Sequence, residues 1–264
     1  MKKIFITGAS SGIGNALAHE YAKRFENTGA IIGLASRRSE HLQQLATELQ
    51  NQYKISCEIY PLDVRDATAL EAAARDFMQL HGTPDIVISN AGVSRGTLTE
   101  YKDDLAAIQA IFDINVMGMV NTFQPFIAAM KQAGRGQLVG VASVAGIRGI
   151  PGSGVYSASK AAAISYCESL RAEMQHFNIH VSTIAPGYVR TPMTKQNQYK
   201  MPFLMDADVF ASKFVDAVEA KVRFKIIPWQ MGVIAKIMRL IPPRLWDYLM
   251  KNAPHKKRVD CDWL

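Results

Sequence analysis

Short apolar runs alternate with longer amphipathic stretches along most of the chain, and this alternation strongly constrains its fold. Most of the runs are continuously apolar, which is typical of strands that are buried on both faces. We expect strands at residues 3–7, 30–36, 55–61, 85–89, 137–143, 180–185 and 223–227. We expect helices at residues 13–25, 40–52, 67–80, 104–131, 156–177 and 206–220. Helical connections of this length join parallel strands, so the pattern predicts an α/β, doubly wound parallel sheet with helices on both faces.

No linker or change in composition divides residues 1–227, so we expect one domain there and a C-terminal helical extension at 228–264. The extension begins with an apolar helical stripe, made by Met231, Ile234, Ala235, Met238 and Ile241. A second short amphipathic piece follows Pro243. Three interpretations fit such a segment: a cover over a substrate opening, a contact between subunits, or an interfacial helix on a membrane.

The net charge of +7 lies in the C-terminal part of the chain, because residues 1–220 hold 20 basic and 20 acidic side chains. A basic tail indicates either a solvated surface or a site for an anionic partner. If the partner is anionic, we expect a membrane surface and no nucleic acid. The three cysteines are far apart and form no CxxC motif, which favours a reducing compartment and no metal site. The apolar run Ile226–Ala235 is too short to span a bilayer. We therefore expect a cytoplasmic protein, with peripheral membrane contact through the tail as one alternative.

A glycine-rich segment connects the first strand to the first helix. Its sequence is Thr7-Gly8-Ala9-Ser10-Ser11-Gly12-Ile13-Gly14. Glycines permit a tight turn and a close approach of the backbone, and the N-terminus of a helix offers free N–H groups to a pyrophosphate. The position of the segment at the start of a βαβ unit therefore predicts a dinucleotide-binding loop with the spacing GxxxGxG.

This spacing resembles the nucleotide loop of the short-chain dehydrogenase/reductase family, which reads TGxxxGIG, and other motifs follow in the order of that family. They are Asp63, Asn90-Ala91-Gly92, Asn115, Ser143 with Tyr156 and Lys160, and Pro186-Gly187 with Thr191. The resemblance covers nearly all of residues 1–227. It implies a Rossmann-type sheet, a nicotinamide cofactor, a small carbonyl or alcohol substrate and a homodimer or homotetramer.

The resemblance also assigns the cofactor contacts. They are Gly8, Ser10, Ser11, Gly12, Ile13, Gly14, Arg37, Arg38, Asp63, Val64, Asn90, Ala91, Gly92, Tyr156, Lys160, Pro186, Gly187, Val189 and Thr191. Asp63 corresponds to the family's adenine contact, and Thr191 to its contact with the nicotinamide carboxamide. An acidic residue after the second strand would bind the ribose 2′-hydroxyl of NAD. Arg37 and Arg38 stand there instead, and guanidinium groups pair well with a 2′-phosphate, which predicts NADP(H).

Tyr156 and Lys160 are four residues apart on a predicted helix, so both side chains lie on one face. A free tyrosine has a pKa of about 10, and a nearby ammonium group favours its ionised form. The family resemblance implies hydride transfer with proton exchange through Tyr156, while Ser143 binds the substrate oxygen. It further implies that Lys160 lowers the pKa of Tyr156 and binds the ribose, and that Asn115 positions a water.

Residues 188–205 follow the Pro-Gly motif, where the family carries a mobile lid over the substrate. The segment is rich in Met, Tyr and Phe, which suits either a hydrophobic substrate or ordinary packing against the domain. Two other functions remain open: a non-catalytic NADP(H) sensor that acts through the basic tail, and a sugar-nucleotide epimerase. The complete set of Ser143, Tyr156, Lys160 and Asn115 disfavours the sensor. The loop spacing and the chain length disfavour the epimerase.

Overall fold

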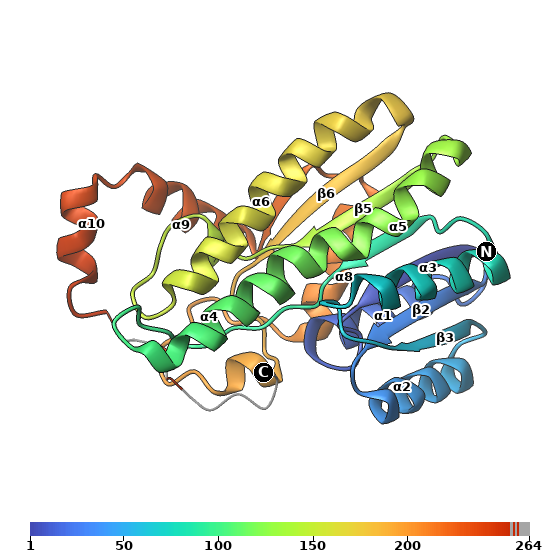
Figure 1. Ribbon diagram of the computed structural model, residues 1–264, viewed down its shortest axis with the longest axis horizontal. Helices are drawn as coiled ribbons and strands as arrows, with labels where there is room; N and C mark the ends of the chain where they lie inside the picture. Colours follow the sequence, from blue (N-terminus) through green and yellow to red (C-terminus); the bar gives the residue numbers. More distant parts are fainter. Residues whose placement is uncertain (254–255, 257, 259–264) are drawn as a thin grey trace.

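The computed structural model describes residues 1–253, 256 and 258. A seven-stranded sheet, parallel throughout, runs through the centre of the molecule in the order β3-β2-β1-β4-β5-β6-β7 (Figure 1). Its strands are β1 (Lys2–Thr7), β2 (Ala30–Ser36), β3 (Ser56–Pro61), β4 (Ile86–Ser89), β5 (Gly136–Val141), β6 (Ile179–Pro186) and β7 (Phe224–Ile227). The order reverses between β1 and β4, and such a switch point opens a crevice at the carboxyl ends of the strands. The predicted doubly wound α/β fold is confirmed.

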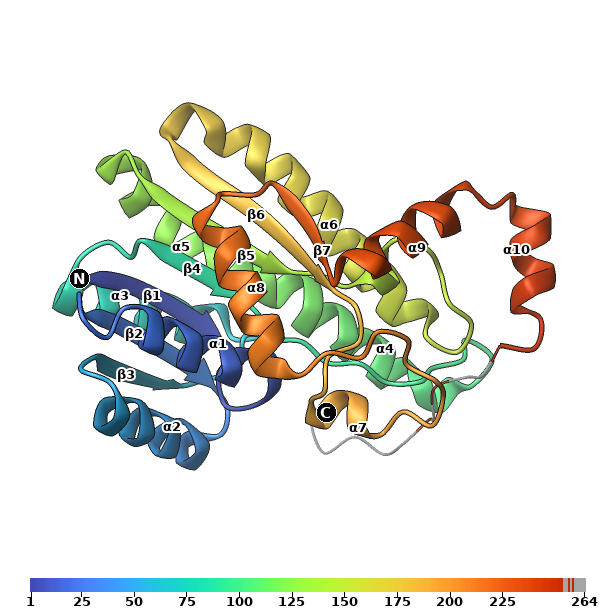
Figure 2. The same cartoon turned by 180° about the vertical axis from the view of Figure 1, so that it is seen from behind.

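Helices cover both faces of this sheet (Figures 1 and 2). On one face lie α1 (Gly12–Arg24), α2 (Ser39–Gln52) and α8 (Ala207–Glu219). On the other face lie α3 (Ala67–His81), α4 (Leu105–Phe112), α5 (Gly118–Ala133) and α6 (Gly154–Met174). Short 3-10 turns span Lys102–Asp104, Val144–Gly146 and Gln175–Phe177, and the short helix α7 spans Pro192–Lys195.

Each face of the sheet has its own hydrophobic core. Leu17, Leu42 and Phe214 are fully buried in one core, and Phe77 and Phe123 are fully buried in the other. In the central strands β1, β2 and β4, alternate side chains enter opposite cores, because successive side chains of a strand point to opposite faces. This arrangement explains why the strand sequences are continuously apolar.

Three predicted elements differ from the structure. The helix expected at residues 104–131 is divided by a π turn over Asp113–Met117, between α4 and α5. The fifth strand ends at Val141 and not at Ser143, because Ser143 caps the following 3-10 turn. The helix expected at 156–177 ends at Met174, and residues 175–177 form a 3-10 turn instead. Other boundaries agree within one or two residues.

Beyond the sheet, α9 (Trp229–Leu240) and α10 (Pro243–Met250) project from one end of the molecule (Figures 1 and 2). The division into a domain at 1–227 and an extension at 228–264 stays a prediction. Within the described residues, one helical run, Lys102–Ala133, is long and apolar enough to cross a membrane by length and composition alone. A single helix of this kind is weak evidence for a span, because core helices pass the same test, and 44% of its most apolar window is buried inside the protein.

Two described residues of the C-terminal tail return to the loop that follows β4. The Lys256 ammonium donates to Ser94 Oγ at 2.9 Å, and Arg258 Nε donates to Asp104 Oδ2 at 2.9 Å. The guanidinium of Arg258 also lies 3.8 Å from the centroid of the Tyr101 ring. The side chain of Asp104 is fully buried, so Arg258 supplies a counter-charge that a buried carboxylate needs. Lys257, Asp260, Cys261 and Asp262, which were part of the charge and cysteine arguments, lie outside the described residues.

Candidate active site

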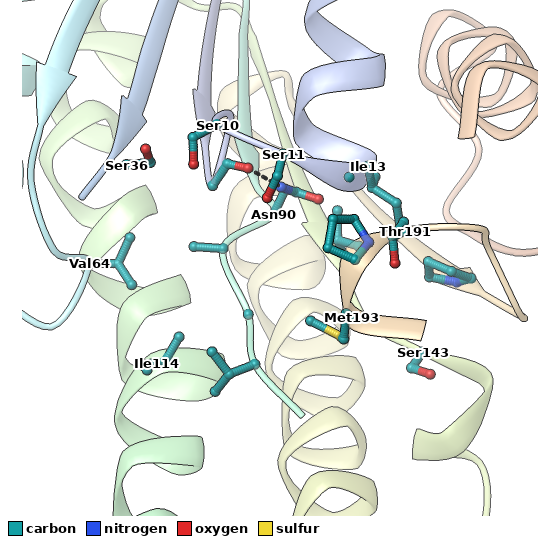
Figure 3. A pocket seen from close by; sticks show the side chains of 18 of the residues that line it. Ser10, Ser11, Ile13, Ser36, Val64, Asn90, Ile114, Ser143, Thr191 and Met193 are labelled. Atoms are coloured by element: carbon teal, nitrogen blue, oxygen red, sulfur yellow. Dashed lines mark hydrogen bonds between the residues drawn. The ribbon is translucent and has the colours of Figure 1, made fainter. Parts of the chain in front are cut away.

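A cleft opens at the carboxyl ends of the strands, across the switch point between β1 and β4. Ser10 and Ser36 lie toward one end and Ser143 lies at the other (Figure 3). Of the predicted site residues, all but Gly14 and Asn115 line this cleft. Lining residues outside the predicted set include Ser36, Leu62, Val93, Ile114, Val141, Ala142, Pro192, Met193 and Thr194.

The glycine-rich loop has the close packing that its sequence predicts. Gly8 and Gly12 have φ angles of +68° and +57°, which side chains other than glycine rarely adopt. Gly14 does not line the cleft. A Cβ at Gly14 would lie 2.3 Å from the Gly8 carbonyl oxygen, so this glycine allows the start of α1 to pack directly on the loop.

Asn90 joins the ends of β1 and β4 below the loop. Its Nδ2 donates to the carbonyl oxygens of Thr7 at 3.0 Å and Gly8 at 3.2 Å. In return, the Thr7 hydroxyl accepts the backbone N–H of Asn90 at 3.2 Å. Thr7 was not predicted as a site residue, although it stands immediately before Gly8. These contacts fix the floor of the cleft.

Basic and hydroxyl groups gather at the end of the cleft beside β2. Arg38 Nη2 donates to Ser10 Oγ at 2.9 Å and to Ser11 Oγ at 2.6 Å. Arg37 lies 3.9 Å from the Asp63 carboxylate. The Ser36 hydroxyl is buried and has no hydrogen-bond partner among the described residues. Two guanidinium groups and an unpaired hydroxyl therefore converge on one small region.

Asp63 lies beside this region and is held by Arg65, whose Nη2 is 2.8 Å from Oδ2. Burial raises the pKa of Asp63, but the hydrogen bonds from the Arg65 side chain and backbone outweigh it and leave the pKa below its ordinary value. Asp63 is consequently an anion that lines the cleft next to Val64.

Ser143 and Tyr156 come from the two sides of the segment that joins β5 to α6. Ser143 lies at the N-terminus of the 3-10 turn, where its Oγ accepts the Ala145 N–H at 3.1 Å. The same turn packs against α6 through Gly146, where a Cβ would lie 2.7 Å from the Lys160 carbonyl carbon. Sequence reasoning did not identify this glycine as part of the site.

Lys160 is buried, with 4% of its surface exposed, and its Nζ donates to the Val141 carbonyl oxygen at 2.9 Å. Burial lowers the pKa of Lys160 to about 8. The Lys160 ammonium lies 6.0 Å from the centroid of the Tyr156 ring.

The expectation that Lys160 lowers the pKa of Tyr156 is not met in this geometry. Burial raises the pKa of Tyr156, and the opposing hydrogen bond with Ser143 is not enough to offset it. The ammonium points to the strand carbonyl of Val141 instead of the phenol oxygen, which explains the difference.

Asn115 lies in the π turn, behind the cleft lining. Its Oδ1 accepts the Val93 N–H at 2.8 Å, while Nδ2 donates to the Val93 carbonyl at 3.0 Å and to Ser159 Oγ at 3.0 Å. The Ser159 hydroxyl in turn donates to the Tyr156 carbonyl at 2.8 Å. Asn115 thus connects the loop after β4 with the first turn of α6. Ser159 is a further residue that sequence reasoning missed.

The segment after β6 covers the Ser143 end of the cleft. Thr191 lines the cleft and forms a capping box with Thr194 at the start of α7, which brings Met193 to the cleft beside it (Figure 3). The rings of Tyr188 and Tyr199 are 6.3 Å apart. Burial, with smaller contributions from Tyr188 and Tyr156, raises the pKa of Tyr199 to about 12.

The profile of the family described as short chain dehydrogenase matches residues 2–202. The chain belongs to the short-chain dehydrogenase/reductase family. It is 37% identical over 245 residues to an uncharacterized oxidoreductase of Myxococcus xanthus, covering 92% of this chain and 93% of the relative. It is also 35% identical to dehydrogenase/reductase SDR family member 7B of Xenopus laevis, covering 72% of this chain and 59% of the relative. The protein is an oxidoreductase of this family.

Solved structures of the short-chain dehydrogenase/reductase family have the same fold. An alcohol dehydrogenase from Thermococcus sibiricus, complexed with 5-hydroxy-NADP, has a TM-score of 0.75 and 26% identity, with 86% of this chain and 95% of that chain covered. L-Sorbose reductase from Gluconobacter frateurii, complexed with NADPH and L-sorbose, has a TM-score of 0.75 and 25% identity, with 86% and 94% covered. Among the described residues, no group of three or more His, Cys, Asp or Glu side chains is placed to hold a metal ion.

Proposed function

We propose that this oxidoreductase uses NADP(H) to interconvert a ketone or aldehyde and the corresponding alcohol, with an apolar substrate. The observation that carries the proposal is the arrangement of the cleft. Cationic and hydroxyl groups gather at its β2 end, while Ser143, Tyr156 and Lys160 meet at the other end. A dinucleotide reaches across such a switch-point cleft, from its phosphate-binding end to its reacting end.

The residues present fit NADP(H) at the β2 end. The unpaired Ser36 hydroxyl and the two guanidinium groups of Arg37 and Arg38 match the oxygens and charge of a 2′-phosphate. Gly8 and Gly12 line the cleft with positive φ angles, and a Cβ at either would press on Ala91 or Thr191, so only glycine allows the tight loop that a bound pyrophosphate requires. Thr191, Val189 and Pro186-Gly187 would hold the nicotinamide end.

When bound, NADPH supplies a hydride to the substrate carbonyl carbon. The residues of this chain manage the charge and the proton that appear on the carbonyl oxygen. Ser143 donates a hydrogen bond to that oxygen as negative charge develops on it. Tyr156 carries its proton at neutral pH, because burial raises its pKa, and gives this proton to the same oxygen. In alcohol oxidation the phenol oxygen accepts the proton.

Lys160 and Asn115 would support this transfer. The buried Lys160 ammonium would bind the ribose hydroxyls and restore the proton of Tyr156, since its pKa of about 8 is close to neutrality. Asn115 Oδ1 keeps a second lone pair beyond its bond to Val93, which suits a water in the relay to solvent. A proton-transferring phenol such as Tyr156 beside Ser143 has no use in a protein that only binds the nucleotide, which disfavours the sensor.

The apolar character of the substrate rests on the segment after β6. Met193 lines the cleft beside Ser143. The rings of Tyr188 and Tyr199, from the same segment, lie 6.3 Å apart and add to its apolar surface. The Met193 thioether provides an adaptable apolar contact with few hydrogen-bonding groups.

The cofactor is tested by measuring the dissociation constants of NADPH and NADH by fluorescence titration. NADPH is expected to bind at least about tenfold more tightly, a difference of about 1.4 kcal/mol. The double variant Arg37→Ser with Arg38→Ser should bind both nucleotides equally, while Arg75→Ser, an arginine on the exposed face of α3, should keep the preference. Equal dissociation constants in the wild-type protein would contradict the proposal.

The reaction is tested with Tyr156→Phe, which removes the hydroxyl and leaves the ring. NADPH binding should remain, and turnover with a panel of aldehydes and ketones should fall at least about 10²-fold. Tyr166→Phe is the matched control, since Tyr166 is on the same helix and is not among the residues that line the cleft. A Tyr156→Phe enzyme that keeps turnover within a few fold would show that another group transfers the proton.

Two expectations about the environment of the protein also remain proposals. A homodimer or homotetramer is supported by the exposed apolar side chains of Leu105, Phe112 and Met117 on the α4–α5 segment. A cytoplasmic location is supported by the free thiols of Cys57 and Cys167, and peripheral membrane contact rests on the C-terminal helices and not on the cleft.

A further inference from the structure

Helix α9 has two apolar faces. Met231 and Ala235 are buried against the rest of the protein. On the outer side, Trp229, Val233, Ile237 and Leu240 recur every three or four residues and form one stripe, here called the outer stripe. Their exposed fractions are 72%, 47%, 56% and 81%. A surface helix ordinarily carries polar residues on this side, so the outer stripe is a surface that needs a partner.

The apolar surface continues onto α10. Leu245 and Leu249 are each about half exposed, and Tyr248 is 77% exposed. Together α9 and α10 form the arm, defined as residues 229–250, which projects beyond the sheet and its helices (Figure 2). A projecting arm can rest on a flat surface without obstruction from the body of the molecule.

The arm is held firmly to the body next to the candidate active site. Arg148 Nη1 donates to the carbonyl oxygens of Met238 and Ile241, at 2.6 Å each, and Arg148 also stacks on Trp246 at 4.6 Å. Arg239 Nη1 donates to the Ile147 carbonyl at 3.2 Å. These contacts attach the arm to the segment between Ser143 and Tyr156, so the outer stripe is exposed in a defined orientation.

The charge around the arm identifies its partner. Residues 221–264 carry ten basic and three acidic side chains, which is the whole net charge of +7. Lys236, Arg239 and Arg244 are exposed on the arm itself, and Lys251 is exposed directly after it. A two-fold contact between copies would place this cationic surface against itself, which is unfavourable. Anionic lipid headgroups complement it, and a Trp and a Tyr on the exposed side suit the interfacial layer of a bilayer.

We propose that the arm docks on an anionic lipid surface. The outer stripe enters the boundary between headgroups and acyl chains, while the basic side chains of the arm contact the headgroups. The arm lies in the membrane plane as an amphipathic, monotopic element and does not span the bilayer. This proposal goes beyond the proposed function and does not depend on the identity of the substrate.

The experiment is co-sedimentation of the full chain with vesicles of phosphatidylcholine containing about 30% phosphatidylserine, compared with pure phosphatidylcholine. The wild-type protein should sediment with the anionic vesicles at low salt and lose at least about tenfold in partition coefficient at high salt. It should not sediment with the neutral vesicles under the same conditions. NADPH binding is measured on the same protein, so that failure of the cofactor proposal is seen separately from failure to bind lipid.

Two pairs of variants separate charge from apolar contact. Lys236→Glu with Arg244→Glu should weaken vesicle binding at least about tenfold, while the control Lys23→Glu with Lys54→Glu, at exposed positions away from the arm, should bind as the wild type does. Ile237→Ser should weaken binding at least about fivefold, because its side chain leaves the membrane interface. Leu80→Ser, at a leucine that is 59% exposed on α3, is the matched control.

Three results would overturn the proposal. The first is the absence of sedimentation with anionic vesicles at low salt while NADPH still binds. The second is binding that the arm variants and their controls weaken equally. The third is a wild-type oligomer that the Ile237→Ser substitution dissociates while vesicles capture no protein, which would assign the outer stripe to a second copy of the chain.

Discussion

Gly146 offers a sharp test of how the 3-10 turn positions Ser143. A Cβ at Gly146 would lie 2.7, 2.8 and 2.9 Å from the carbonyl carbon and oxygen of Lys160 and the nitrogen of Ala161. These atoms belong to the backbone of α6 and cannot rotate away. Because the closest unstrained contacts begin near 3.4 Å, the turn in Gly146→Ala must move away from α6 by about 0.7 Å. Overpacking of this kind costs about 1–3 kcal/mol.

The displacement should affect the reaction more than cofactor binding. A misplacement of about 1 Å at a reacting group can cost on the order of 10² in rate, so we expect kcat/KM of Gly146→Ala to fall about 10- to 100-fold. The dissociation constant of NADPH should change little, because Arg37, Arg38 and the glycine-rich loop lie away from the turn. Thermal unfolding should show a Tm lower by about 2–10 °C.

Gly149→Ala is the matched control for this experiment. Gly149 lies three residues further along the same segment, and a Cβ there would have no atom within 4 Å. It should keep the kcat/KM and Tm of the wild type. If Gly146→Ala also kept both, the argument that close packing of the turn on α6 positions Ser143 would be wrong.

Three further predictions concern buried polar groups. Lys160→Met should stabilise the cofactor-free protein at pH 7 by on the order of 3 kcal/mol, because burial lowers the pKa of Lys160 from 10.5 to about 8. Between pH 8 and 10.5 folding of the wild-type protein releases the Lys160 proton, so its charge no longer opposes folding. Thermal melts should therefore show the gain from the substitution shrinking over this range and vanishing above it. Arg258→Met should lower Tm near neutral pH. Burial raises the pKa of Asp104, but the hydrogen bonds from Arg258 and the backbone outweigh burial and leave this pKa below its ordinary value. The stabilisation by ionised Asp104 is therefore present above pH about 4 and is lost as pH falls through the folded pKa. A Tm difference that stayed constant from pH 7 to about 3 would contradict that linkage. Ser159→Ala should reduce kcat more than it raises KM, because it removes the hydrogen bond that orients Asn115, and an unchanged kcat in steady-state assays would exclude this positioning role.

The sheet and the cofactor end of the cleft could be predicted from the sequence because their signals are local. Continuous apolar runs mark strands buried between two layers, and the run Ala30–Ser36 has the same boundaries in the structure. The glycine spacing predicts the loop because positive φ angles and close backbone approach require glycine at Gly8 and Gly12. Arg37 and Arg38 could be placed at the cleft because they directly follow that strand.

Contacts between distant parts of the chain could not be predicted in this way. Asp104 and Arg258 are 154 residues apart, and nothing in either local sequence indicates the pair. The direction of the Lys160 ammonium toward Val141 depends on how α6 packs on β5. On α9, an apolar residue looks the same in sequence whether it faces the core, as Met231 does, or the solvent, as Trp229 does.

The π turn at Asp113–Met117 has a consequence for the rotational phase of the helix that contains it. One residue of an α-helix corresponds to about 100° of rotation, and a π turn holds one more residue than an α turn. The apolar positions of α5 are therefore shifted by one residue from where a continuous α-helix starting at α4 would put them. With this shift, both helices can still pack on the same sheet. A one-residue deletion within the turn would restore regular α-helical pairing without rotating either flank. Ile114 and Asn115, the two buried residues of the turn, would lose their present orientation toward the cleft and its support.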